Sequence, residues 1–152
     1  MPSLESRIPP PAVVLVLGGL VWLASRAAPL LRFDLPGQNW LAVVLVSAGF
    51  LIGIAGVVTF RRARTTVDPR KPRASSLVTW GVYALSRNPM YLGGLIMLLG
   101  WALFLSNALA FLFLPAYILY IDRFQIAPEE RALTSLFGET YAAYQVRARR
   151  WL

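Results

Sequence analysis

Two short groups of residues carry the side chains with which this chain can do chemistry. The first group comprises Tyr83, Arg87, Asn88, Pro89, Tyr91 and Gly93. The second group comprises Glu129, Glu130, Tyr141 and Tyr144. Arginine binds a carboxylate or phosphate through a bidentate fork, and glutamate accepts hydrogen bonds from amines and hydroxyls. Together these side chains suit a zwitterionic ligand that also carries a polar sugar.

The residue types that are missing narrow this chemistry further. The chain has no cysteine and no histidine. Disulfide and thiol chemistry are therefore excluded, and the commonest metal ligand and general base are absent. We predict no metal site, so the reaction has to use other polar side chains or a bound cofactor.

Composition identifies the class of protein. Of the 152 residues 57% are hydrophobic and only 14% are charged, and the mean hydropathy is +0.59. A soluble domain carries about a quarter charged residues, so we predict an integral membrane protein. The net charge of +8 comes from basic residues beside apolar stretches. This pattern is typical of cytoplasmic loops, and it favours membrane lipids rather than nucleic acid as partners.

The apolar stretches predict an all-α fold with about four transmembrane helices in a single membrane domain, residues 1–152. The expected spans are 12–31, 40–60, 89–106 and 108–126, since a span needs about 20 apolar residues. The last two are joined by almost no loop, which predicts a tight antiparallel hairpin. The tail 127–152 is predicted to be an amphipathic helical segment on the cytoplasmic surface, with one apolar face formed by Leu133, Leu136, Phe137, Tyr141 and Tyr144.

Charge asymmetry between the loops predicts the orientation. The loop 61–88 is rich in basic residues, namely Arg61, Arg62, Arg64, Arg70, Lys71, Arg73 and Arg87. The C-terminal tail adds Arg147, Arg149 and Arg150, whereas the first loop has only Arg26 and Arg32, with Asp34. We therefore expect both termini and the loop 61–88 to be cytoplasmic, in a bacterial or archaeal cytoplasmic membrane. A cleavable signal peptide is an alternative for the N-terminus, but the first apolar region runs on past Arg26.

The predicted hairpin also predicts where the two polar groups lie. A hairpin returns its end beside its start, so both groups should meet at the same cytoplasmic edge of the membrane. Taken singly, the same residues also suit plainer roles. Arg87 can be one more cytoplasmic arginine, the tyrosines can belong to an interfacial belt, and the glutamates can cap a helix.

The segment LVTWGVYALSRNPMYLGGLIMLLGWAL, followed by EERALTSLFGETYAAYQ, resembles two families of membrane-embedded methyltransferases. These are the isoprenylcysteine carboxyl methyltransferases and the phospholipid N-methyltransferases. The shared pattern falls on Gly81, Tyr83, Arg87, Pro89, Tyr91, Gly93, Glu129, Glu130, Phe137, Gly138, Tyr141 and Tyr144. The histidine of that pattern is Asn88 here. Asparagine still forms hydrogen bonds, but it does not carry a proton near neutral pH.

The resemblance implies S-adenosylmethionine as methyl donor and a lipophilic, membrane-borne acceptor. That acceptor is an isoprenylcysteine-type carboxylate or a phospholipid amine. Arg87 and Glu130 are then expected to be catalytic, and both polar groups are expected to bind the cofactor. In this reading Arg87 faces the donor's carboxylate, a glutamate faces its amine or ribose, and Gly93 and Gly94 let it approach the backbone.

Two other functions stay open at this point. The C-terminal pattern also resembles the NADPH-dependent sterol reductases, although those chains are much longer. A non-catalytic membrane protein that keeps the fold for binding is the second alternative, since Asn88 departs from the pattern. The identity of the acceptor and the oligomeric state are left open by the sequence.

Overall fold

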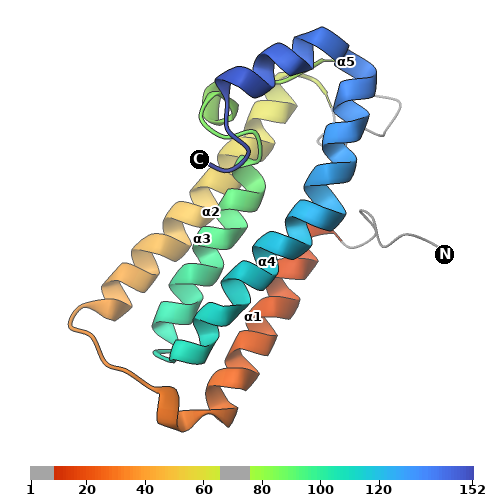
Figure 1. Cartoon of the computed structure of the whole chain (residues 1–152). Helices are drawn as coiled ribbons and strands as arrows, with labels where there is room; N and C mark the ends of the chain where they lie inside the picture. The colour runs from red at the N-terminus through yellow and green to blue at the C-terminus, as the bar shows by residue number, and fades with distance from the viewer. Residues whose placement is uncertain (1–8, 66–75) are drawn as a thin grey trace, which may run out of the picture.

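The chain forms an antiparallel helical bundle in the computed structural model, which describes residues 9–65 and 76–152 (Figure 1). Its α-helices are α1 (Pro10–Ala27), α2 (Gln38–Arg62), α3 (Pro89–Phe104), α4 (Phe113–Ile121) and α5 (Ala127–Arg147). No strand occurs among the described residues, which confirms the predicted all-α class. The predicted basic residues Arg70, Lys71 and Arg73 lie outside the described residues.

The helices have the length and the outer surface of a membrane protein. α1, α2 and the continuous helical stretch Ala108–Arg147 are each long and apolar enough to cross a bilayer, and α3 is a shorter apolar helix. Large apolar side chains cover the outside of the bundle, among them Leu15, Leu51 and Leu119. In lipid such side chains have no reason to be buried, because the surroundings are as apolar as they are.

Most helix ends differ from the ends of the expected spans by a few residues, and two of the differences change the path of the chain. The first helix ends at Ala27, not at Leu31, because the chain leaves the helix at Ala28 and Pro29–Leu31 forms a separate 3₁₀ turn. The fourth span does not stop before the tail. A π-helical turn at Asp122–Ile126 joins α4 directly to α5. Pro128 interrupts nothing, because a proline is tolerated in the first turn of the helix that it begins.

Close contact between α2 and α3 depends on glycines. A Cβ atom added at Gly93 would lie 2.5 Å from the Gly49 carbonyl oxygen, and one added at Gly100 would lie 2.8 Å from the Ala42 carbonyl oxygen. Both backbones therefore approach to a distance that leaves no room for a side chain. Small residues at such a crossing are typical of helix pairs in membranes.

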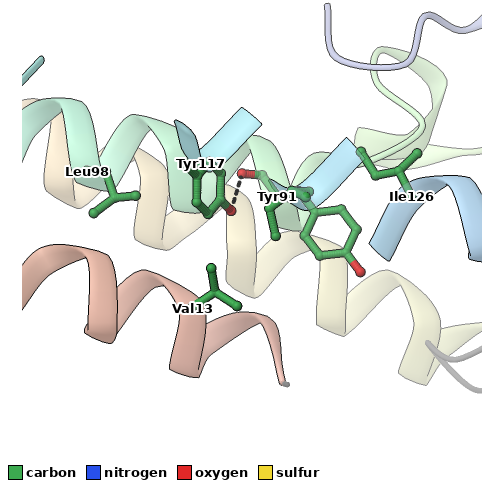
Figure 2. Packing of buried hydrophobic residues seen from close by; sticks show 6 residues of the cluster. Val13, Tyr91, Leu98, Tyr117 and Ile126 are labelled. Atoms are coloured by element: carbon green, nitrogen blue, oxygen red, sulfur yellow. Dashed lines mark hydrogen bonds between the residues drawn. The ribbon is translucent and has the colours of Figure 1, made fainter. Parts of the chain in front are cut away.

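A buried cluster holds α1 and the hairpin of α3 and α4 together (Figure 2). Tyr117 is fully buried, and its hydroxyl donates to the Tyr91 carbonyl oxygen at 3.0 Å. Val13 from α1, Leu98 from α3 and Ile126 from the π-helical turn pack around this pair. The hydrogen bond satisfies a phenol that would otherwise be costly to bury. It also fixes the start of α3 against α4.

α5 lies across one end of the bundle, beside the end of α2 and the start of α3 (Figure 1). Gly138 has a φ of 46° and a ψ of −122°, so it bends α5 into two parts. Tyr141 and Tyr144 beyond the bend are buried. Leu133 and Phe137 pack against these two tyrosines, whereas Leu136 is 53% exposed.

Candidate active site

The two polar groups of the sequence meet at the end of the bundle that α5 covers. Arg87 Nη2 donates to Glu130 Oε1 at 3.0 Å, and the Tyr91 hydroxyl donates to Glu129 Oε1 at 2.7 Å. These contacts join the start of α3 to the start of α5. The hairpin of α3 and α4 lies between them and brings them together, as its topology predicts.

Arg87 is held almost entirely by the protein itself. Its Nη1 atom donates to the carbonyl oxygens of Gln145 and Ala148, at 3.1 and 3.3 Å. These carbonyls belong to the last turn of α5, where helical carbonyls lack partners and a cation is favourable. The Nε atom is buried, with no hydrogen-bond partner among the described residues. The side chain therefore fixes Glu130 and the end of α5 relative to the start of α3.

Glu130 is shared by two arginines. Besides the bond from Arg87, its carboxylate receives Arg150 Nη2 at 2.6 Å and Arg150 Nε at 3.2 Å. The Glu130 side chain is 16% exposed, and that of Arg87 is 12% exposed. The bonds to Glu130 raise the pKa of Arg150 above its usual range, because they favour the charged guanidinium. Glu130 thus lies at the centre of a charged cluster.

The sequence interpretation missed Arg150, and it treated the C-terminal segment as a topological signal. The segment returns to the site instead. The Arg87 amide donates to the Arg149 carbonyl oxygen at 2.8 Å, and Asn88 Nδ2 donates to the Arg150 carbonyl oxygen at 2.9 Å. Trp151 Nε1 then donates to Asp122 Oδ1 at 3.2 Å. No periodicity marks these residues, because the segment after α5 is not helical.

A cluster of tyrosines forms the deeper wall of the site. The Tyr144 hydroxyl donates to the Tyr83 carbonyl oxygen at 2.6 Å, and the Tyr83 ring meets the Phe60 ring edge-on at 5.1 Å. The Tyr83 hydroxyl is buried and has no partner among the described residues. An unsatisfied buried hydroxyl costs about 1–3 kcal/mol, so a polar group placed against it would be stabilised.

The phenols at this wall are neutral hydrogen-bond donors. Burial raises the pKa of Tyr141 and of Tyr144 to about 12, and it raises that of Tyr83 further above the usual range. Neighbouring groups add to the effect, with Glu130 acting on Tyr141 and Tyr144 acting on Tyr83. A tyrosine has to lose its proton before it can act as a base. These three residues therefore do not serve as bases near neutral pH.

These residues surround one pocket at the mouth of the bundle. It encloses about 70 Å³, and it measures about 710 Å³ when the space open to solvent is counted. Its wall includes Tyr83, Arg87, Asn88, Tyr91, Glu129, Glu130, Tyr141 and Tyr144, with apolar Phe60, Met90, Leu133 and Phe137 beside them. The enclosed volume is below the usual range for small-molecule sites, about 300–1,000 Å³. A ligand of that size has to occupy the open part as well.

Gly93 and Gly94, which were expected to lie near a cofactor, lie where helices pack against each other. Gly93 faces Gly49 of α2, and a Cβ atom at Gly94 would lie 2.5 Å from the Tyr117 hydroxyl. Neither glycine lines the pocket. In this structure the two glycines let helices approach each other, and their expected contact with a cofactor stays a prediction. Pro89 is fully buried at the first position of α3, where its fixed φ favours the start of a helix.

The comparison with known proteins finds its match in the region of the chain that forms most of this site. Residues 38–140 match the model of the phospholipid methyltransferase family. The chain belongs to this family. The match includes Arg87 and Glu130, and it ends before Arg150 and its partners. It confirms the methyltransferase resemblance, and it favours this reading over the reductase alternative.

Individual relatives support the same assignment. The chain is 32% identical over 135 residues to a protein-S-isoprenylcysteine O-methyltransferase of Xenopus laevis, covering 82% of this chain and 44% of that protein. It is 30% identical over 136 residues to protein-S-isoprenylcysteine O-methyltransferase A of Arabidopsis thaliana, covering 84% and 68%. An uncharacterised protein of Haemophilus influenzae is 51% identical over 63 residues, which are 41% of this chain and all of that protein. The chain thus spans less than half of the Xenopus relative.

Proposed function

We propose that this protein transfers a methyl group from S-adenosylmethionine to a lipophilic acceptor that reaches the site from the bilayer. The observation that carries the proposal is the convergence of Arg87, Glu130 and Glu129 on one pocket, within the region that the methyltransferase family shares. The names of the relatives support methyl transfer. The apolar outer surface of the bundle supports an acceptor that is dissolved in the membrane.

The pocket fits the donor in the chemistry of its wall. Glu129 suits a positive charge of the donor, its amine or its sulfonium, whereas Glu130 is already bound by Arg87 and Arg150. Phe60 and Phe137 offer flat apolar surfaces for an adenine ring, and the Tyr83 hydroxyl offers an unused hydrogen bond. When bound, the donor supplies a methyl group on a sulfonium, which is already a good electrophile.

The protein's own part is to bind and align. Arg87 is a positioning residue in this proposal, because its Nη atoms are used by α5 carbonyls and Glu130 and its Nε atom is buried. This revises the expectation that Arg87 faces the donor's carboxylate. Alignment of the nucleophile with the methyl group supplies most of the rate in such a displacement, because the reacting groups are held at contact distance.

The acceptor decides whether a base is needed. A carboxylate acceptor of the isoprenylcysteine type is already a nucleophile at neutral pH, so binding and alignment are sufficient. A phospholipid amine has to lose a proton first. The neutral tyrosines do not accept that proton, and Asn88 does not carry one. Only Glu129 and Glu130 are left to take it, and both already accept hydrogen bonds within the protein. The site therefore suits a carboxylate acceptor better than an amine.

The test is a transfer assay with the full chain in detergent or nanodiscs. Protein is incubated with methyl-labelled S-adenosylmethionine and either a prenylated cysteine or phosphatidylethanolamine, and the labelled product is identified by mass spectrometry. We expect label on the prenylated carboxylate. Label on the phospholipid amine alone would reject the carboxylate preference. Transfer to neither acceptor nor to an extract of membrane lipids would reject the proposed activity.

A further inference from the structure

The end of the bundle opposite the candidate active site carries a second hollow. Its wall is formed by the last turn of α1, the connection 28–37, the start of α2 and the joint between α3 and α4. Figure 1 shows these segments together at the end of the bundle away from the second half of α5. The volume of the hollow is about 640 Å³. This is within the usual range for small-molecule sites, about 300–1,000 Å³, and far larger than the enclosed part of the active-site pocket.

Hydrogen bonds between distant segments fix the shape of this hollow. The Phe33 amide donates to the Ser106 carbonyl oxygen at 3.0 Å, and Gln38 Nε2 donates to the Ser106 hydroxyl at 2.5 Å. Asn107 is fully buried, and its Nδ2 atom donates to the Ala28 carbonyl oxygen at 2.7 Å. The connection is thus tied to the hairpin on both sides. The hollow does not need a ligand to form.

Two arginine side chains line the hollow and have no polar partner in the described part of the chain. Neither the Arg26 side chain nor the Arg32 side chain makes a hydrogen bond or an ion pair there. The Arg26 guanidinium lies 5.4 Å from the centroid of the Trp22 ring, a contact that leaves its N–H groups available. Asp34 also lines the hollow. Two unused guanidinium forks beside one carboxylate favour an anionic ligand that also carries a hydroxyl donor.

The surroundings place this hollow at a membrane surface. Leu30 is 96% exposed and Trp40 is 79% exposed, and both border the same connection. An exposed tryptophan at the end of a spanning helix is typical of the headgroup region of a bilayer. The loop charges predict that this is the non-cytoplasmic side, where arginine is depleted. Two arginines there need a reason other than topology.

We infer that this hollow binds the headgroup of an anionic phospholipid of the surrounding bilayer. Arg26 and Arg32 hold the phosphodiester, which matches the guanidinium fork. Asp34 accepts a hydrogen bond from a headgroup hydroxyl. Trp22, Phe104 and Leu105 line the same hollow and pack against the glycerol and the first acyl carbons. The site is separate from the methyl-transfer pocket and does not depend on the proposed activity.

The first experiment needs no variant. The full chain is purified in detergent and titrated with phosphatidylglycerol, phosphatidylcholine or free glycerol phosphate, and binding is followed by native mass spectrometry. We expect an apparent dissociation constant at least about tenfold lower for phosphatidylglycerol than for phosphatidylcholine. Equal binding of the two lipids would overturn the inference. Binding of glycerol phosphate as tight as that of phosphatidylglycerol would show a site for soluble anions, which also overturns it.

Variants then locate the site. The double substitution Arg26→Gln and Arg32→Gln should raise the dissociation constant for phosphatidylglycerol about tenfold or more, because it removes charged hydrogen bonds. The control is Arg61→Gln with Arg62→Gln, which removes the same charge at the other end of the bundle. An equal loss in the control would show general attraction to anionic lipid and overturn the inference. Arg26→Lys with Arg32→Lys keeps the charge and should restore binding only in part.

Discussion

Both ends of the bundle carry arginines beside carboxylates, yet they use them differently. At the candidate active site Arg87 and Arg150 share Glu130, and Arg87 also binds two carbonyl oxygens at the end of α5. At the opposite end the side chains of Arg26 and Arg32 have no polar partner in the part of the chain that is described. The same residue type therefore fixes the shape of one site and remains available to a ligand in the other.

This difference changes how the active site is interpreted. A resemblance in sequence assigns Arg87 to the cofactor, because an arginine in a shared pattern suits a carboxylate. The structure assigns its Nη donors to the protein. The Tyr83 hydroxyl is left for a ligand, and the carboxylates Glu129 and Glu130 lie in the same wall with partners of their own. The following predictions test this division, from the largest expected effect on stability to the smallest.

Removal of Arg87 should cause the largest loss. Arg87→Ala leaves Glu130 without one of its charge partners and two α5 carbonyls without a donor. Removing one partner of a largely buried ion pair costs about 3–5 kcal/mol of unfolding free energy. The measurement is denaturant unfolding in detergent, with Arg149→Ala as control, because the Arg149 side chain is exposed. Equal stability of the two variants would contradict the positioning role of Arg87.

Gly93 should be the next most sensitive position. The added methyl group of Gly93→Ala meets the Gly49 carbonyl oxygen, so α2 and α3 have to move apart, at about 1–3 kcal/mol. Gly53→Ala is the matched control in α2, because nothing lies within 4 Å of its added methyl group. Thermal unfolding compares the two variants. If Gly93→Ala left stability unchanged and abolished donor binding, Gly93 would be a cofactor residue after all.

Removal of Arg150 should have a smaller effect. Its side chain is 42% exposed, so solvent screens its ion pair with Glu130. Arg150→Ala is expected to cost about 1 kcal/mol or less, since exposed pairs contribute about 0.2–1 kcal/mol. Arg150→Lys should recover part of the loss. Unfolding of both variants beside Arg87→Ala checks the order. If Arg150→Ala lowered the free energy of unfolding as much as Arg87→Ala does, the two arginines would contribute equally to stability, which contradicts the expected order.

The arginines at the opposite end should matter least for folding. Arg26→Gln with Arg32→Gln removes no hydrogen bond within the described residues. Substitutions of this kind usually change stability by less than about 0.5 kcal/mol. Unfolding is measured in a detergent without anionic lipid, so that a bound headgroup does not contribute. A loss above about 1 kcal/mol would show that these arginines support the fold, as Arg87 does.

The sequence predicts the parts of this molecule that follow from apolar length and topology. The four apolar stretches form helices in the structure, and the ends of these helices differ by a few residues from those expected. The hairpin alone predicts that Arg87 and Glu130 meet, because a short connection returns α4 beside α3. The bend in α5 lies at Gly138, a residue type that adopts a positive φ at little cost. Each of these features depends on residues that are close together in the chain.

Other features depend on which way a residue faces, and the sequence does not determine that. Tyr91 and Gly93 are two positions apart in α3, and each step along a helix turns the side-chain direction by about 100°. Tyr91 therefore lines the pocket, whereas Gly93 faces α2. Arg150 follows α5 in an irregular segment, where no periodicity applies. The π-helical turn Asp122–Ile126 also has no sequence signal of its own, yet it sets the direction in which α5 leaves the bundle.

Binding of the methyl donor tests the central claim most directly. Calorimetry compares S-adenosylmethionine with NADPH on the wild-type chain, on Glu129→Gln and on Leu136→Ala, whose side chain is exposed outside the pocket. We predict that S-adenosylmethionine binds and NADPH does not. Glu129→Gln should weaken binding about five- to 150-fold, since a lost charged hydrogen bond costs about 1–3 kcal/mol. Leu136→Ala should bind as the wild type does. Binding of NADPH alone, or equal affinity in all three proteins, would contradict the site.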